Sequence, residues 1–364
     1  GIAVAEAIGH ILDKLGPSPD FAVVFMSGHF CNQVGDIHSA VHELLRPNVL
    51  IGCTAAAVVC GSKEIEEQSA LTIFGGNVDG EVSALRLDDL PNLLSDTTQP
   101  QIDTDSHTMI LLADSFSFPA EAAVANWRLT HPHIQIIGGL ASSANTSSGE
   151  CLFLDGEIFR DGAVALLVTG PVVIEPLVSQ GCRPIGSPLI VTSAKENMVY
   201  ELGGQPALQR LEALIDAMSD EERALVNHGL HIGRVIDEHK LDFTRGDFLI
   251  RAVIGADRES GVVAIGDLAP VGSTVQFQVR DASSAAEDLD QLASQIAIAD
   301  GALLFTCNGR GTNLFETENH DASKVAARIT GEAVAGMFCA GEIGPVSERS
   351  FLHGFTASAA IFRD

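Results

Sequence analysis

An internal repeat in the first half of the chain constrains the fold more than any other sequence feature. Each copy consists of an apolar run, an amphipathic segment and two further apolar runs, at 21–28, 35–47, 48–59 and 69–74 in the first copy and at 107–116, 119–132, 134–145 and 162–168 in the second. Ser27 and Gly52 are 25 residues apart, and Asp114 and Gly138 are 24 apart. Short apolar runs of this kind are typical of strands, and the amphipathic segments are typical of helices. The pattern predicts two β-α-β-β units, offset by about 86 residues.

Small residues mark the same place in both copies, at 52–55 and at 138–141. We predict that a turn ends the second strand there, because glycine lets backbone N–H groups approach a ligand closely. For the cysteine in the first of these turns, a buried thiol that only fills space is the alternative. The candidate ligand-binding residues at the two turns are Gly52, Cys53, Gly138 and Gly139.

The last part of the chain repeats this theme with a longer connection. We expect a strand at 301–307, a helix at 321–330 and further strands at 333–341 and 351–362. Strand-like runs and two helices fill the middle of the chain, where clustered prolines place a domain boundary between 170 and 205. The sequence therefore predicts an α+β fold, with two layered domains whose mixed β-sheets are flanked by helices and contain internally repeated β-α-β-β units.

The composition limits the classes of function. The 364 residues are 46% hydrophobic, enough for two domains with full cores. With 21 Lys and Arg against 48 Asp and Glu, the formal net charge is −27, which repels nucleic acids and anionic membrane surfaces. No apolar run approaches the roughly 20 residues of a membrane span, so neither nucleic-acid binding nor membrane insertion is expected. The seven cysteines form no CxxC pair and are read as reduced, which favours a cytoplasmic location and leaves open a targeting segment outside these residues.

Candidate binding residues follow the strand expected at 301–307. The segment ALLFTCNGRG ends in Cys307 and a Gly-Arg-Gly turn that contains Arg310 and Gly311. Because lysine is scarce, a positive site in this chain is an arginine site, suited to bidentate capture of a carboxylate or phosphate. The alternative is structural, with a buried cysteine that fills space and an arginine in a salt bridge.

Three more polar residues lie among glycines and apolar strands. Glu342 is in the turn-like segment GEIGP, where its carboxylate either points into a cleft or accepts N–H bonds of the turn. His353 and Thr356 are in FLHGFT, where a histidine is more often a hydrogen-bonded core residue than a ligand. We predict that the side chains of Arg310, Glu342 and His353 converge on one solvent-accessible pocket.

Signatures of the common enzyme classes are absent from the sequence. It contains no GxxxxGK[ST], GxGxxG, GxSxG or HExxH motif. Paired histidines, such as His131 with His133 and His228 with His231, are read as surface or loop residues rather than metal ligands. We therefore expect neither a catalytic site nor a metal site.

Several motifs together resemble the FIST family, the two-part sensory domain of bacterial signalling proteins, archaeal proteins and eukaryotic F-box proteins. The matching segments are IGCTAAAVV and IIGGLASS in the first half, and DFLIRAVIGAD, STVQFQVRDASSAAEDL, ALLFTCNGRG, GMFCAGEIGP and FLHGFT in the second. The resemblance implies a FIST N-like domain at 1–196 and a FIST C-like domain at 197–364.

The resemblance also implies a ligand-sensing module of signal transduction without catalytic activity, whose ligand is an amino acid or another small carboxylate. Two alternatives stay open, a haem-binding nitric oxide sensor with an axial histidine such as His353, and a protein-interaction scaffold or adaptor. Since no output domain is visible in the sequence, a signalling or adaptor protein is an expected partner. The motif positions imply a pocket of Cys307, Arg310, Gly311, Glu342, His353 and Thr356, with Arg251, Arg280 and Asp281 as further positions of unassigned role.

Overall fold

The chain forms two compact units in a computed structural model that describes residues 2–30, 32–87, 107–143, 149–227, 229–346 and 348–363. The first unit combines Gly1–Ser179 with Leu289–Asp364, and the second is Gln180–Asp288. The second unit is thus inserted in the chain between the middle and last parts of the first. The boundary that the family resemblance implies, between 196 and 197, remains a prediction.

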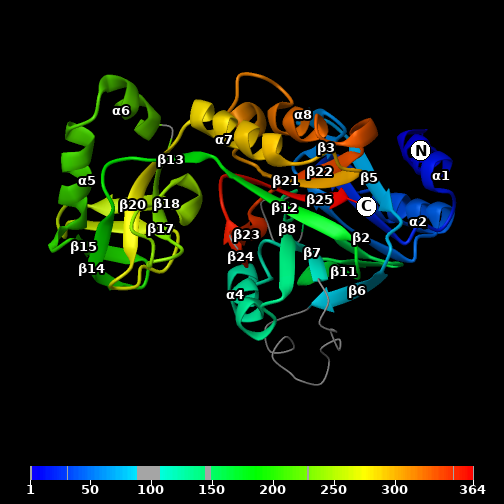
Figure 1. Cartoon of the computed structure of the whole chain (residues 1–364), viewed down its shortest axis with the longest axis horizontal. Coiled ribbons are helices and arrows are strands. Elements are labelled where there is room, and N and C mark those ends of the chain that lie inside the picture. Colours follow the sequence, from blue (N-terminus) through cyan, green and yellow to red (C-terminus); the bar gives the residue numbers. More distant parts are fainter. Residues whose placement is uncertain are drawn as a thin grey trace. The chain divides into compact units, whose positions relative to one another are not determined.

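The first unit contains three copies of one motif, a parallel pair of buried strands joined by a helix (Figure 1). The copies are β1 (Phe21–Ser27), α2 (Val34–Leu45) and β2 (Val49–Ala55); β7 (His107–Ala113), α4 (Ala120–Thr130) and β8 (Ile134–Leu140); and β21 (Gly301–Cys307), α8 (His320–Ala326) and β22 (Val334–Cys339). Both faces of these strands are buried, which explains their unbroken apolar runs. The α+β fold predicted from the sequence is confirmed, and the repeat occurs three times.

Each of the three sheets contains strands of two copies, because one hairpin of each copy pairs with a strand of another copy. A third strand pairs antiparallel with the first strand of its own copy, namely β5 (Leu71–Gly76), β11 (Ala163–Thr169) or β25 (Thr356–Arg363). The hairpin that follows each second strand pairs with a different copy. The hairpin β3 (Val58–Cys60) to β4 (Lys63–Ile65) joins β22, β9 (Leu152–Leu154) to β10 (Glu157–Phe159) joins β2, and β23 (Glu342–Val346) to β24 (Arg349–His353) joins β8.

Two further strands complete the outer edges of two sheets. β6 (Glu81–Leu87) pairs with β11, and β12 (Val173–Gln180) lies beside β25. The strand orders are β10-β9-β2-β1-β5 in the first sheet, β24-β23-β8-β7-β11-β6 in the second and β12-β25-β21-β22-β3-β4 in the third. No repeat therefore builds its sheet from its own strands alone.

A glycine recurs at the same position of the second strand in every copy. Gly52, Gly138 and Gly336 lie opposite Val24, Leu111 and Leu304 of the neighbouring parallel strand, and a Cβ at any of the three would collide with that residue's carbonyl oxygen. The close approach of the two backbones explains the glycine. The turns predicted at 52–55 and 138–141 are wrong, because β2 continues to Ala55 and β8 to Leu140.

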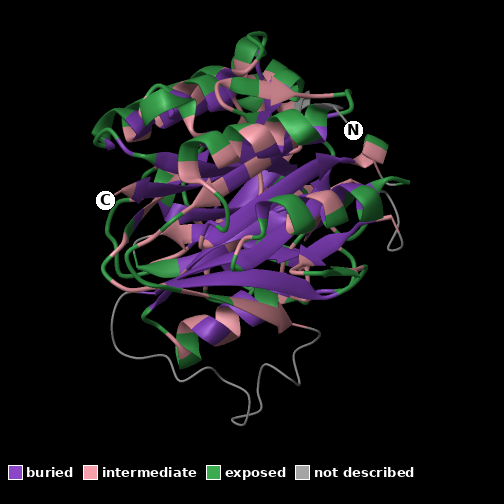
Figure 2. Ribbon diagram, turned by 90° about the vertical axis from the view of Figure 1, so that its right-hand side faces the viewer, coloured by how far each residue is buried: buried purple, intermediate pink, exposed green. Residues whose placement is uncertain are grey.

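The inward faces of the three sheets share one apolar core. It includes Phe25, Leu112 and Phe305 from the first strands, and the rings of Phe25 and Phe305 meet edge to face with centroids 6.0 Å apart. The helices cover the outer faces, and Figure 2 shows buried strands inside and exposed helix surfaces outside. α1 (Ile2–Leu15) and α7 (Ala282–Gln295) precede β1 and β21 respectively, and each packs on the outer face of the sheet that follows it.

The second unit is a barrel-like antiparallel sheet. Six strands form a closed ring in the order β20-β14-β15-β19-β18-β17, with β17 returning to β20. The bounds are β13 (Cys182–Pro184), β14 (Leu189–Lys195), β15 (Met198–Leu202), β16 (Gln205–Pro206), α5 (Ala207–Asp216), α6 (Asp220–Asn227), β17 (Leu230–Val235), β18 (Phe248–Asp257), β19 (Val262–Ile265) and β20 (Thr274–Arg280). Its core, which includes Val191, Val263 and Phe277, is separate from that of the first unit.

Candidate functional site

A buried ion pair lies just beyond the carboxyl end of β21. Arg310 is 0% exposed, and it donates from Nε and Nη2 to the two carboxylate oxygens of Asp321, at 2.6 and 2.8 Å. Asp321 stands in the first turn of α8. Burial alone would raise the pKa of Asp321, but the charge and hydrogen bonds of Arg310 hold it well below its usual range. The pair is therefore ionised and geometrically fixed.

Neighbouring groups hold this ion pair in place. Thr306 Oγ1 donates to Asp321 Oδ2 at 2.6 Å, and His320 Nδ1 lies 2.9 Å from Oδ1. The His320 ring stacks on Phe315 with centroids 3.7 Å apart. Glu64 lies on the β3–β4 hairpin of the first copy and accepts the N–H of Ala322 at 2.8 Å. Burial together with the charge of Asp321 raises the pKa of Glu64 to about 7.

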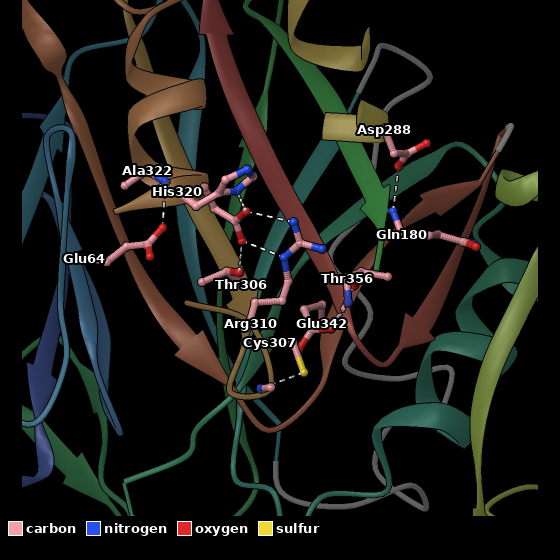
Figure 3. Close-up of polar contacts among 12 residues, drawn as sticks. Glu64, Gln180, Asp288, Thr306, Cys307, Arg310, His320, Ala322, Glu342 and Thr356 are labelled. Carbon is pink, nitrogen blue, oxygen red and sulfur yellow. Dashed lines mark hydrogen bonds and ion pairs between the residues drawn. The ribbon is translucent and has the colours of Figure 1, made fainter. Parts of the chain in front are cut away.

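Glu342 lies on the other side of Arg310, as Figure 3 shows. Its carboxyl group is 0% exposed, and Oε2 accepts the N–H and the hydroxyl of Thr356 at 3.0 and 2.8 Å. Burial raises the pKa of Glu342 to about 8, although the bonds from Thr356 and the charge of Arg310 oppose the rise. Near neutral pH this carboxyl group is therefore largely protonated.

The repeat shows how unusual a carboxyl group is at this position. Glu342 is the β-partner of Gly139, the residue after the repeated glycine. The equivalent partners in the other two copies are Leu152, opposite Cys53, and Val58, opposite Met337. Both are apolar and 0% exposed in the shared core. Glu342 thus occupies a core position that the other copies fill with hydrocarbon.

Cys307 completes the group at the end of β21. Its side chain is nearly buried, and the N–H of Gly309 donates to its sulfur at 3.4 Å. Burial and the neighbouring Glu342 raise the pKa of Cys307 to about 12. The sulfur is therefore a thiol at neutral pH, not a thiolate nucleophile.

The structure brings together four of the predicted site residues, Cys307, Arg310, Glu342 and Thr356 (Figure 3). Two details differ from the prediction. The side chains are buried instead of lining a solvent-accessible pocket. Bidentate capture of a ligand by Arg310 is also not available in this state, because Asp321 occupies two of its nitrogens.

The local structure around these residues also differs from the prediction. The segment GEIGP forms strand β23 instead of a turn, because it pairs with β8 and β24. The single strand predicted at 351–362 is two strands, β24 and β25, and Phe355 between them has a positive φ of 66°. An αL phenylalanine is strained, which places backbone strain beside the Thr356–Glu342 contact.

His353 is directed to the backbone instead of to Arg310. Its Nε2 lies 2.9 Å from the carbonyl oxygen of Gly344, and the ring is 3% exposed. An axial haem ligand must present a ring nitrogen to an open face, and a cysteine ligand must be a thiolate. Neither His353 nor the Cys307 thiol meets these conditions, so the residues do not fit haem here.

The glycines and Cys53 have structural explanations of their own. Cys53 lies in the shared core with its sulfur 3.1 Å from that of Met337. A Cβ on Gly139 would collide with the sulfur of Cys339, and one on Gly311, whose φ is 55°, would lie 2.7 Å from Phe338 and Glu66 atoms. Their role in ligand binding remains a prediction.

Sequence reasoning missed the groups that support Arg310. Asp321 was expected only near a helix start, and nothing in the sequence marked Thr306, His320 or Glu64 as its neighbours. The one sequence signal that could have pointed to these neighbours is the adjacent pair His320-Asp321 at a helix start. Arg251, Arg280 and Asp281 lie in the second unit, where Asp281 accepts the Ser284 hydroxyl at 2.7 Å and Arg251 lies 3.6 Å from Asp267.

Two family models match the chain, and the boundary between them falls within the second unit. The FIST N domain model matches residues 20–205, and the FIST C domain model matches 207–345. Uncharacterized protein Mb0898c of Mycobacterium bovis and uncharacterized protein Rv0628c of Mycobacterium tuberculosis are each 40% identical over 371 residues, which span 100% of this chain and 95% and 96% of theirs. Uncharacterized protein MJ1623 of Methanocaldococcus jannaschii is 24% identical over 173 residues, 44% of this chain and 34% of that protein. The chain therefore belongs to the FIST family of signal-transduction sensory domains.

Proposed function

We propose that the chain is a non-catalytic sensory module that binds a small carboxylate, such as an amino acid, between Arg310 and Glu342. The observation that carries the proposal is a pair of buried polar atoms. Among the described residues, Arg310 Nη1 and Glu342 Oε1 have no hydrogen bond of normal geometry, although both side chains are wholly buried, and besides Thr356 the weakly donating Cys307 thiol also approaches the Glu342 carboxyl group. An unsatisfied buried polar group costs about 1–3 kcal/mol, so a ligand that satisfies both atoms gains that amount twice.

The chemistry of the two atoms favours a carboxylate. Nη1 is a charged donor, and the largely protonated Glu342 supplies a second donor close by. A carboxylate has two acceptor oxygens and can accept from both. The ammonium of an amino acid would add a donor of its own.

Binding at this place links two sheets of the first unit. Arg310 follows β21 of the third sheet, whereas Glu342 belongs to β23 of the second. Because both groups are buried, a ligand enters only when the structure opens between Arg310 and Glu342. The bound ligand then holds the two sheets in one arrangement. A change of this kind is what a signalling or adaptor partner would detect.

The test is ligand-induced stabilisation. Formate, acetate, glycine and alanine are added to the purified chain, and the melting temperature and the heat of binding are measured; native mass spectrometry reports any retained molecule. We expect at least one compound to raise the melting temperature, and the Glu342→Leu variant, which places a leucine where a second copy has Leu152, to fold and lose the response. Glu316→Leu, at an exposed position, is the matched control.

The pH dependence of binding separates a carboxylate from a cation. If protonated Glu342 donates to the ligand, affinity falls about tenfold per pH unit above a pKa near 8. Affinity that rises with pH would point instead to an ammonium bound by ionised Glu342. A response that survives in Glu342→Leu, or no response to any compound and no retained molecule, would contradict the proposal.

A further inference from the structure

In the part of the first unit that the structure describes, one sheet edge carries no strand where the repeat predicts one. In the second sheet, β6 covers the outer edge of β11 and pairs with it antiparallel from Leu87↔Ala163 to Glu81↔Thr169. In the third sheet, β12 takes the same place beside β25. In the first sheet, β5 is the equivalent of β11 and β25, and no described strand lies outside it.

The helix α1 does not substitute for the missing strand. α1 packs on the outer face of the first sheet, where its Ile11 and Leu15 lie next to Gly75 of β5. α7 packs on the outer face of the third sheet, where Leu289 and Ile296 pack with Leu304. The third sheet nevertheless carries β12 at its edge. The helix and the edge strand are thus separate positions, and among the described residues only the helix position is filled beside β5.

The sequence of β5 lacks the features by which proteins protect open edges. Edge strands commonly carry charges or proline, because these block pairing with another chain. The five other outer strands of the three sheets each contain such a residue: Glu157 on β10, Glu81 on β6, Arg349 on β24, Pro176 on β12 and Lys63 on β4. β5 reads LTIFGG, with neither a charge nor a proline, and four of its six residues are partly exposed.

We propose that the outer edge of β5 is a dimerisation surface, at which β5 of a second copy of this chain pairs antiparallel with it. In an antiparallel ladder every second residue directs its N–H and C=O away from the partner strand, so β5 presents an unused row of donors and acceptors beyond β1. A twofold axis at this edge places LTIFGG against itself without opposing charges. The first sheets of two copies then form one continuous sheet, and each β5 has the neighbour that β11 and β25 have within the chain.

The net charge of −27 predicts how this association depends on salt. Two copies repel one another at low ionic strength, and added salt screens the repulsion while leaving backbone hydrogen bonds in place. We therefore expect the dimer to strengthen when sodium chloride is added.

Sedimentation velocity of the full chain across a dilution series tests the proposal, together with hydrogen exchange of the β5 amides at high and low concentration. We expect a monomer–dimer equilibrium, with β5 amides protected in concentrated samples and exchanging faster on dilution. Ile73→Lys places a like charge from each copy at the edge and should weaken association at least about tenfold. Val173→Lys, at an exposed position of edge strand β12, is the matched control and should leave the dimer unchanged.

Hydrogen exchange keeps the test valid if Ile73→Lys fails to fold, because that measurement needs no variant. A chain that stays monomeric at every concentration and salt level would overturn the proposal. So would a dimer whose β5 amides exchange equally fast at both concentrations, or one that persists unchanged in a folded Ile73→Lys variant. Protection of β5 in the monomer would also overturn it, since the edge would then be covered within one chain.

Discussion

At Glu342 a carboxyl group stands where the other copies of the repeat bury Val58 and Leu152. A core position of this kind normally contributes hydrophobic burial, and a carboxyl group there instead incurs a desolvation cost. Two bonds from Thr356 and the charge of Arg310 offset part of that cost. A residue that opposes folding in this way is a candidate for function.

The pKa of Glu342 predicts how stability depends on pH. Its pKa is about 8 in the folded protein, above the ordinary value of 4.5. Between these two pH values the folded protein therefore keeps a proton that the unfolded chain has released. The stabilisation is complete below pH 4.5 and is lost as pH rises towards 8, by about 1.4 kcal/mol per pH unit. Glu342→Gln should remove this dependence, which urea unfolding at a series of pH values measures.

The exposed control Glu316→Gln should retain the wild-type slope. Glu64 and Glu150, whose pKa values are each raised to about 7, titrate in both variants and leave a residual slope. Identical slopes for Glu342→Gln and the wild type would show that Glu342 is ionised in the folded protein.

At the scale of elements, the sequence correctly predicted the strands that are buried on both faces. The apolar runs that became β1, β7, β11 and β21 needed no information beyond their own residues. GEIGP could not be predicted as a strand, because β23 exists through pairing with β8, about 200 residues earlier in the chain. The same reason hid the burial of Glu342, whose surroundings come from three separate segments.

The repeated glycine gives a prediction at this scale. Gly52→Ala, Gly138→Ala and Gly336→Ala should each lower the free energy of unfolding by roughly 3 kcal/mol, because each new methyl group meets a carbonyl oxygen of the adjacent strand. Gly138→Ala should cost the most, since the φ of Gly138 is 154°, a region that disfavours a residue with a side chain, whereas Gly52 and Gly336 have no positive φ. Gly9→Ala, in the interior of α1 with open space around its Cβ, should instead stabilise by about 0.5–1 kcal/mol. Chemical denaturation measures the free energy of unfolding of all four variants. A repeated glycine that alanine replaces without loss of stability would contradict the expected collision.

At the scale of the whole molecule, the sequence predicted an α+β chain with repeats and a boundary near the proline cluster. It could not predict that the barrel-like unit is inserted into the first unit. The pairing of β12 with β25, across that insertion, is a contact between segments more than 170 residues apart. Local patterns contain no information on such pairings, so the third copy of the repeat was recognised only as a similar theme.

The two ends of the inserted unit lie side by side, which makes its removal a direct test. Asp281 donates its N–H to the carbonyl of Gly181 at 3.5 Å, and Cys182 pairs with Arg280. We expect that replacing residues 183–279 by a short Gly-Asn turn leaves the first unit folded, with its own core and the Arg310–Glu342 group intact. Circular dichroism, thermal unfolding and the carboxylate response measure the outcome. A shortened chain that does not fold would show that the first unit depends on the second.

The exchange of hairpins among the three copies also bears on how such a chain arose. A single copy lacks the strands that complete its own sheet, because its neighbours supply them. An ancestral gene that encoded one copy would therefore have yielded a folded protein only as a ring of three identical subunits with swapped hairpins. In one continuous chain the three equivalent positions can differ in sequence, and here one carries a glutamate while the other two carry hydrocarbon side chains.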